Sequence, residues 1–277
     1  MFRTPGTFAI AAVFFLSPVI APALHATEPT LLDQGYRDMY NLNFDNAHRS
    51  FRDWERKYPG DPMGPASDAA AYLFSEFDRM HILQSEFFVQ NSSFLHLRKM
   101  APDARVKARF EEALHRSELL ANAILQRSPG DRTALFATVL RLGLHADYLA
   151  LIEKRYVGSL SEVKQSREVA EQLVSKHPEC YDAYLAPGVE NYLLSLKAAP
   201  VRWILRMNGA QTDKDAGVAK LRLTAEKGRY LKPYARLLLA VAALRDKDLA
   251  GARQILTWLT QQFPQNHLYR EELAKIQ

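Results

Sequence analysis

The chain has 277 residues, of which 48% are hydrophobic and 24% charged, and its 36 Lys and Arg against 31 Asp and Glu give a formal net charge of +5. This apolar content excludes a disordered chain, and the modest counts of 12 Gly and 14 Pro exclude collagen-like and low-complexity classes. A single cysteine, Cys180, excludes a disulfide scaffold and a thiolate zinc cluster, each of which needs several sulfurs.

Residues 1–26 have the pattern of a secretory signal peptide. One positive charge precedes a short apolar stretch over residues 8–16, and small residues follow up to Ala26. The stretch is shorter than the roughly 20 residues of a membrane span. We therefore expect cleavage after Ala26 rather than Ala23. The mature chain, residues 27–277, is predicted to be one periplasmic or secreted domain without a transmembrane segment. An uncleaved anchor is the alternative.

After the signal, apolar residues recur every three or four positions, which is the period of one helix face. Segments of this kind are bounded by Pro, Gly and Asp, and alternating strand patterns are absent. The predicted helices cover residues 35–54, 66–88, 106–126, 133–155, 161–176, 181–196, 200–209, 215–226, 233–245, 249–262 and 268–276. The sequence therefore predicts an all-α fold of about eleven or twelve helices.

Four helix-ending prolines share a common register. These prolines are Pro59, Pro129, Pro178 and Pro264. Twelve positions before them stand the small residues Ala47, Ser117, Ser166 and Ala252, and five positions before them stand Trp54, Ile124, Leu173 and Leu259. Small residues allow two helices to approach, and the larger ones fill the space between them. This fixed spacing indicates an array of helical repeats. A non-repeating bundle whose helices happen to end in proline is the alternative.

The pattern resembles the tetratricopeptide repeat (TPR) family. The first unit carries the resemblance through Gly35, Phe44, Ala47, Phe51, Trp54 and Pro59, and the last unit through Leu249, Ala252, Leu256 and Pro264. The resemblance implies a TPR-like α-alpha superhelix, or solenoid, of five or six helix pairs, similar to secreted bacterial proteins of this kind. The four prolines are irregularly spaced, whereas strict repeats recur every ~34 residues, so some units are lengthened or degenerate.

Motifs for catalysis are weak. The chain has no His-Glu-x-x-His, no Gly-x-Ser-x-Gly and no Gly-rich phosphate loop. Glu112 with His115, and Asp78 with His81, have the spacing of helical di-metal sites, which is also that of ordinary surface pairs. Glu190 is the most suggestive acid for glycan processing, and a buried Glu bonded to Tyr hydroxyls is the alternative. We predict no catalytic residue, metal or cofactor; a metallo-hydrolase or glycan-processing enzyme is the alternative.

Charge is distributed unevenly along the chain. Residues 27–90 contain eleven acids and six bases, whereas residues 197–236 contain ten bases and three acids. An exported chain does not normally meet nucleic acid, so the basic segment predicts contact with an anionic lipid, glycan or protein surface. A solvated helix face is the alternative. Within this segment, residues 201–206 are interpreted as a core helix with snorkelling Arg side chains rather than a membrane contact.

In the TPR family the first helix of each unit lines a concave surface. Here that register contains Tyr36, Met39, Tyr40, Leu73, Phe74, Phe136, Leu140, Leu144, Val189 and Tyr192. This surface is either covered by neighbouring helices, which we favour because large exposed apolar patches are rare, or open to a peptide or apolar ligand.

The predicted function is an exported, non-catalytic scaffold that binds a protein or peptide partner. Its candidate partner-binding residues are Tyr36, Tyr40, Phe136, Glu190 and Tyr192. A binder of small apolar ligands, accessory to a transporter, is a further alternative.

Overall fold

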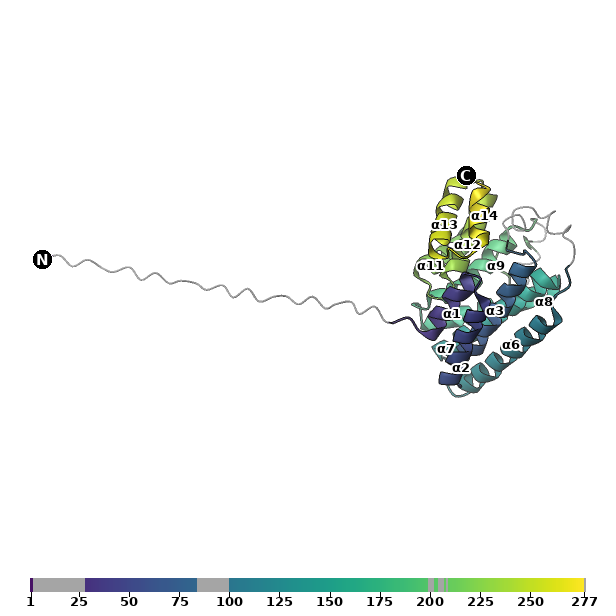
Figure 1. Ribbon diagram of the computed structural model, residues 1–277, viewed down its shortest axis with the longest axis vertical. Helices are drawn as coiled ribbons and strands as arrows, with labels where there is room; N and C mark the ends of the chain where they lie inside the picture. The colour runs from purple at the N-terminus through teal and green to yellow at the C-terminus, as the bar shows by residue number, and fades with distance from the viewer. Residues whose placement is uncertain (2–27, 84–99, 199–201, 204–206, 208, 277) are drawn as a thin grey trace.

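The computed structural model describes residues 1, 28–83, 100–198, 202, 203, 207 and 209–276 (Figure 1). In this part of the chain the fold is all-α, with eleven α-helices and no strand. The predicted signal peptide, residues 1–26, lies outside the described residues apart from Met1.

The helices follow one another through short connections. They are α1 (Leu31–Tyr40), α2 (Phe44–Lys57), α3 (Met63–Arg79), α6 (Ala104–Leu125), α7 (Arg132–Asp147), α8 (Tyr156–Lys176), α9 (Leu185–Ser195), α11 (Lys214–Lys227), α12 (Lys232–Arg245), α13 (Leu249–Gln262) and α14 (His267–Ala274). A π-helical turn, η1 (Tyr148–Ile152), extends α7, and a 3-10 turn, η2 (Tyr181–Tyr184), precedes α9.

Two of the predicted helices are divided or shortened in the structure. The helix predicted over 35–54 is divided into α1 and α2, and the one predicted over 66–88 ends at Arg79. In both cases a residue with positive φ follows the helix: Leu42 at 63° and His81 at 55°. The next amides bond back across the last turn, Asn43 to the Asp38 carbonyl at 2.9 Å, for example. This is the Schellman arrangement, which terminates a helix because a left-handed residue cannot continue it.

The predicted repeat register coincides with helix contacts. The four small residues of that register are all buried, and the Ser117 hydroxyl donates to the Pro62 carbonyl at 3.0 Å. The residues before three of the prolines, Tyr58, His177 and Phe263, share one backbone geometry, with φ between −129° and −134°. Proline disfavours the helical region for the residue before it, and α2, α8 and α13 end where the prolines predict.

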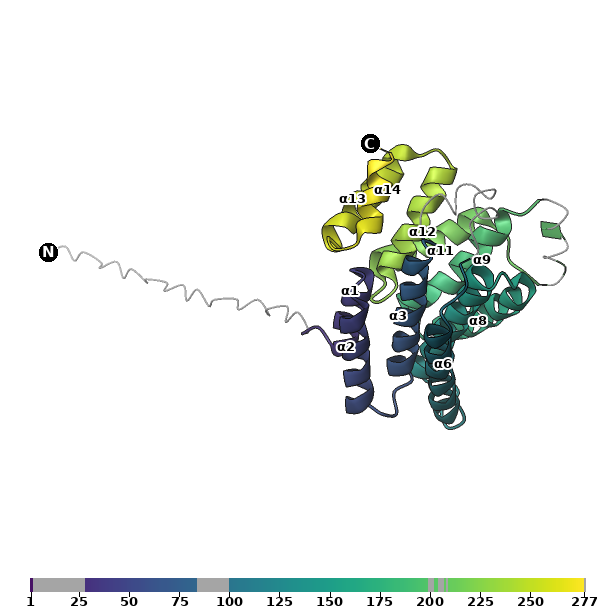
Figure 2. The same ribbon diagram turned by 45° about the vertical axis from the view of Figure 1, so that its right-hand side comes forward.

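Each helix packs mainly against its neighbours in sequence (Figures 1 and 2), and α1 also contacts the C-terminal part of the chain. The Asn266 side-chain amide donates to the Tyr40 carbonyl at 2.8 Å, and Arg229 pairs with Asp33 at 2.6 Å. These contacts join α1 to the loops before α12 and α14. One continuous core therefore extends from Leu32 to Tyr269.

One long apolar helix is part of this core. Residues Arg132–Ile152, which form α7 and η1, are long and apolar enough to span a membrane by length and composition. However, 61% of the apolar window is buried in the protein, where α7 packs against α3, α6 and α8. Its hydrophobicity is accounted for by these contacts.

The interpretation of residues 201–206 as a core helix is wrong for Trp203. Its side chain is 63% exposed, and nearby Met207 is 69% exposed. Residues 201 and 204–206 lie outside the described part of the chain.

Candidate functional site

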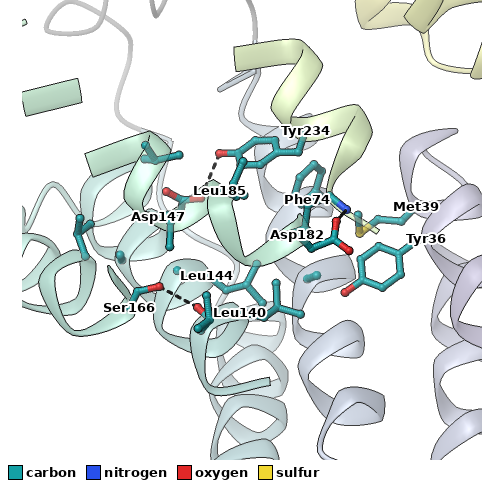
Figure 3. A pocket seen from close by; sticks show the side chains of 18 of the residues that line it. Tyr36, Met39, Phe74, Leu140, Leu144, Asp147, Ser166, Asp182, Leu185 and Tyr234 are labelled. Carbon is teal, nitrogen blue, oxygen red and sulfur yellow. Dashed lines mark hydrogen bonds between the residues drawn. The ribbon is translucent and has the colours of Figure 1, made fainter. Parts of the chain in front are cut away.

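A partly open apolar cavity of about 80 Å³ lies where α1, α3, α7, α8, α9 and α12 converge (Figure 3). It is lined by Tyr36, Met39, Tyr40, Ala70, Phe74, Val139, Leu140, Gly143, Leu144, Ala146, Asp147, Val163, Ser166, Asp182, Leu185, Ala186, Val189, Leu231 and Tyr234. Six helices and η2 thus contribute to one small volume at the centre of the protein.

Most of the predicted concave surface faces this cavity. Seven of its ten residues line the cavity: Tyr36, Met39, Tyr40, Phe74, Leu140, Leu144 and Val189. The other three, Leu73, Phe136 and Tyr192, are buried elsewhere. The register derived from the helix periodicity therefore identified an internal surface.

The five candidate partner-binding residues do not form one exposed surface. Tyr36 and Tyr40 line the cavity, and Phe136 stacks on a neighbouring ring at the edge of the core. Tyr192 belongs to a separate small cluster, and Glu190 forms an internal ion pair. All five side chains are buried, with 6% exposure or less. In this conformation little of their surface is therefore exposed to a protein partner.

Gly143 leaves the cavity open on its α7 side. A Cβ atom built at this position would meet only one neighbouring atom, the Ser166 Oγ at 4.0 Å. Glycine inside a helix costs about 1 kcal/mol relative to alanine, and no close approach of another helix requires it here. The local consequence of Gly143 is therefore empty space next to α7.

Most polar groups around the cavity have partners within the protein. The Ser166 hydroxyl donates to the Val139 carbonyl at 3.0 Å, and the Tyr36 hydroxyl accepts from Ser67 Oγ at 3.1 Å. The Asp182 carboxylate accepts three backbone N–H groups from the loop between α11 and α12, at 2.9 to 3.3 Å. Burial raises the pKa of Asp182, and these N–H donors act against that rise.

Asp147 has fewer partners. It is the last residue of α7, next to the π-helical turn η1, and such turns are frequent at functional sites. Among the described residues its carboxylate accepts one hydrogen bond, from Tyr234 Oη to Asp147 Oδ2 at 3.1 Å (Figure 3). Burial raises the pKa of Asp147 to about 7, although the bond from Tyr234 lowers it.

The Tyr40 hydroxyl is buried without a hydrogen-bond partner among the described residues. Removing it by Tyr40→Phe is expected to increase the free energy of unfolding by ~1 kcal/mol, because an unpaired buried hydroxyl is unfavourable. Tyr36→Phe is the matched control and should lower the free energy of unfolding by ~1 kcal/mol, since the Ser67 hydroxyl then loses its acceptor. Urea denaturation of both variants tests this; a loss of stability in Tyr40→Phe would contradict it.

The candidate metal and acid residues lie apart from the cavity. Among the described residues no group of three His, Cys, Asp or Glu side chains converges as metal ligands would. Glu112 pairs with Arg109 at 3.0 Å, and His267 contacts Asp78 at 3.3 Å. Glu190 is buried, but its close partner is Arg167, whose Nε lies 2.6 Å from Glu190 Oε2. The alternative, a buried Glu bonded to Tyr hydroxyls, is thus right about the burial of Glu190 and wrong about its partner.

Bases of segment 197–236 make contacts within the protein. Arg229 pairs with Asp33, and Lys214 pairs with Asp246 at 2.5 Å. The Arg236 guanidinium lies 4.0 Å from the centre of the Trp258 ring. Part of the positive charge of this segment is therefore paired within the protein.

No protein-family model, curated protein or solved structure matches the chain.

Proposed function

We propose that this chain is an exported, TPR-like helical protein that binds a slim, mainly apolar ligand in its central cavity. The observation that carries the proposal is Gly143, which keeps the cavity wall open at the cost of helix stability. Two further observations support it. The exposed lining is almost wholly apolar, and it combines residues from six helices that are far apart in the chain.

The cavity dimensions favour a narrow ligand. An apolar cavity of about 150 Å³ in another helical protein takes up benzene, so about 80 Å³ suits a narrower group such as a short alkyl segment. Each buried methylene contributes about 0.8 kcal/mol, so a chain burying four of them gains about 3 kcal/mol before the costs of association. We therefore expect modest affinity for simple probes.

Filling the cavity tests the proposal. Gly143→Leu is expected to weaken binding of 1-octanol, a neutral probe, by about tenfold or more while leaving the fold intact, because the new side chain occupies the ligand's space. Isothermal titration calorimetry measures the affinity and circular dichroism the fold.

A glycine outside the cavity supplies the control. Gly158 lies in α8, and a Cβ there would meet Leu149 at an ordinary contact distance of 3.4 Å. Gly158→Ala should leave octanol affinity unchanged. Equal affinity in wild type and Gly143→Leu would show that octanol binds elsewhere.

A protein-binding scaffold is the second candidate, and one surface favours it. Tyr156, Val157 and Leu160, in the first turns of α8, are 50%, 85% and 40% exposed. Crosslinking to a cell-envelope partner that is lost in Val157→Asp and retained in Gly143→Leu would support this function over ligand binding.

A further inference from the structure

Asp147 is the cavity carboxylate with hydrogen-bonding capacity left for a ligand. A carboxylate has about four acceptor positions, and the described residues supply one donor, Tyr234 Oη. Asp182 differs, because three backbone N–H groups hold it in place. A ligand bound in the cavity next to Asp147 would therefore complete its hydrogen bonding.

The surroundings of Asp147 determine the charge of that ligand. No Lys, Arg or His is among the residues that line the cavity, so the described protein provides no cation to Asp147 there. The rings of Phe74 and Tyr234 pack edge to face at 5.5 Å and also line it. Aromatic faces and a carboxylate both attract a cation and disfavour an anion.

We propose that the ligand of this cavity is an aliphatic amine whose protonated amino group binds the Asp147 carboxylate beside Tyr234. This inference rests on the proposed function and adds the class of ligand. Figure 3 shows Asp147 and Tyr234 on one side of the cavity and Tyr36 and Met39 on the other, with Leu140 and Leu144 between them. The alkyl chain would extend from the carboxylate along these apolar side chains.

The proposal predicts how affinity depends on pH. Titratable groups facing the cavity are Tyr36 and Tyr40 from α1, Asp182 from η2, Tyr234 from α12 and Asp147 itself, while α3, α8 and α9 contribute none. Burial raises the pKa of all three tyrosines, so they stay neutral. Because the pKa of Asp147 is raised to about 7, amine affinity should increase with pH up to about 7 and level off above it.

The experiment compares three eight-carbon probes of equal length: octylamine, 1-octanol and octanoate. At about pH 8 we expect octylamine to bind about tenfold or more tighter than octanol, and octanoate to bind weakest. At about pH 5.5 the advantage of octylamine over octanol should shrink, because Asp147 is then protonated. Calorimetry at both pH values supplies the affinities.

Two variants assign the effect to Asp147. Asp147→Asn should abolish both the preference for octylamine and its pH dependence, while octanol affinity stays within about threefold. Because Asp182 is unchanged in this variant, the result also shows which of the two cavity carboxylates binds the amine. Tyr234→Phe removes the donor that lowers the pKa of Asp147, so the rise in amine affinity should move to higher pH. If Asp147→Asn does not fold, the pH shift in Tyr234→Phe tests whether Asp147 binds the amine.

Two results overturn the inference. Equal binding of octylamine and octanol by the wild type at about pH 8, or a preference retained in Asp147→Asn, would exclude Asp147 as the amine site and leave apolar binding standing. Failure of all three probes to bind would instead remove the proposed function together with the inference.

Discussion

Replacing Asp182 with alanine is expected to lower the free energy of unfolding by ~3–5 kcal/mol. The buried carboxylate accepts the backbone N–H groups of Arg229 at 3.0 Å, Tyr230 at 3.3 Å and Leu231 at 2.9 Å. A buried donor left without a partner costs about 1–3 kcal/mol, and alanine leaves the buried N–H of Leu231 and the part-buried N–H groups of Arg229 and Tyr230 without their acceptor. The total stability of a domain is typically only about 5–15 kcal/mol, so the loss is large.

Asp182 also explains the shape of this loop. The loop joins α11 to α12, and it carries Arg229, which pairs with Asp33 of α1, and Tyr230, which stacks on Tyr36 at 4.8 Å. A Cβ at Gly228 would lie 2.7 Å from Asp182 Oδ1, so glycine is required where the carboxylate meets the chain. Losing the carboxylate should therefore also weaken the contact between α1 and the loop before α12.

The control for this prediction is another aspartate that bonds to backbone amides. Asp213 caps α11 by accepting from the Ala216 N–H at 3.0 Å in an exposed position, and Asp213→Ala should cost ~1 kcal/mol. Urea denaturation of Asp182→Ala and Asp213→Ala compares the two. Equal losses would mean that burial of the loop donors adds nothing.

Helix positions were predictable from sequence because apolar residues repeat with the helical period and because proline restricts its predecessor. The division of the helix predicted over 35–54 and the early end of the one predicted over 66–88 have a common cause. Helices that end in a left-handed residue usually have glycine there, whereas here the residues are Leu42 and His81. The side chains carry no signal for such a turn, and only the surrounding packing selects it.

The cavity was partly predictable for the same reason. The helical register identified the apolar lining, but Asp147 and Tyr234 are 87 residues apart in the chain, and nothing in the sequence indicates that they meet. A weak signal was present: Gly143 and Asp147 are four positions apart in a long apolar helix, and therefore lie on one face of it. Glu190 and Tyr192 were predicted to bind a partner together with Tyr36 and Tyr40, but they do not line the cavity. The reason is that α9 packs between α8 and α11, so only part of the surface of α9 faces the cavity.

Replacing Gly217 with alanine is expected to lower the free energy of unfolding by ~2–3 kcal/mol. A Cβ there would lie 2.6 Å from the Tyr192 backbone nitrogen and 3.0 Å from the Gly188 carbonyl oxygen. Backbone atoms cannot rotate away as a flexible side chain can, so α9 and α11 must separate. Overpacking of this kind costs about 1–3 kcal/mol or more, and the better helix propensity of alanine offsets part of that.

Gly143→Ala is the matched comparison, because it makes the same chemical change in a helix where there is space. It should increase the free energy of unfolding by ~1 kcal/mol, opposite in sign to Gly217→Ala. Urea denaturation of both variants tests the difference, and changes of the same sign would refute it.

Gly217→Ala also tests how the cavity is held together. Gly217 does not line the cavity, but α9, which it contacts, supplies Leu185, Ala186 and Val189 to the lining. If separation of α9 from α11 moves these side chains, octanol affinity should fall in Gly217→Ala although no atom has been added to the cavity. Unchanged affinity combined with lower stability would mean that α8 alone holds α9 against the cavity. In that case the two glycines have independent roles: Gly217 permits helix packing, and Gly143 leaves room for the ligand.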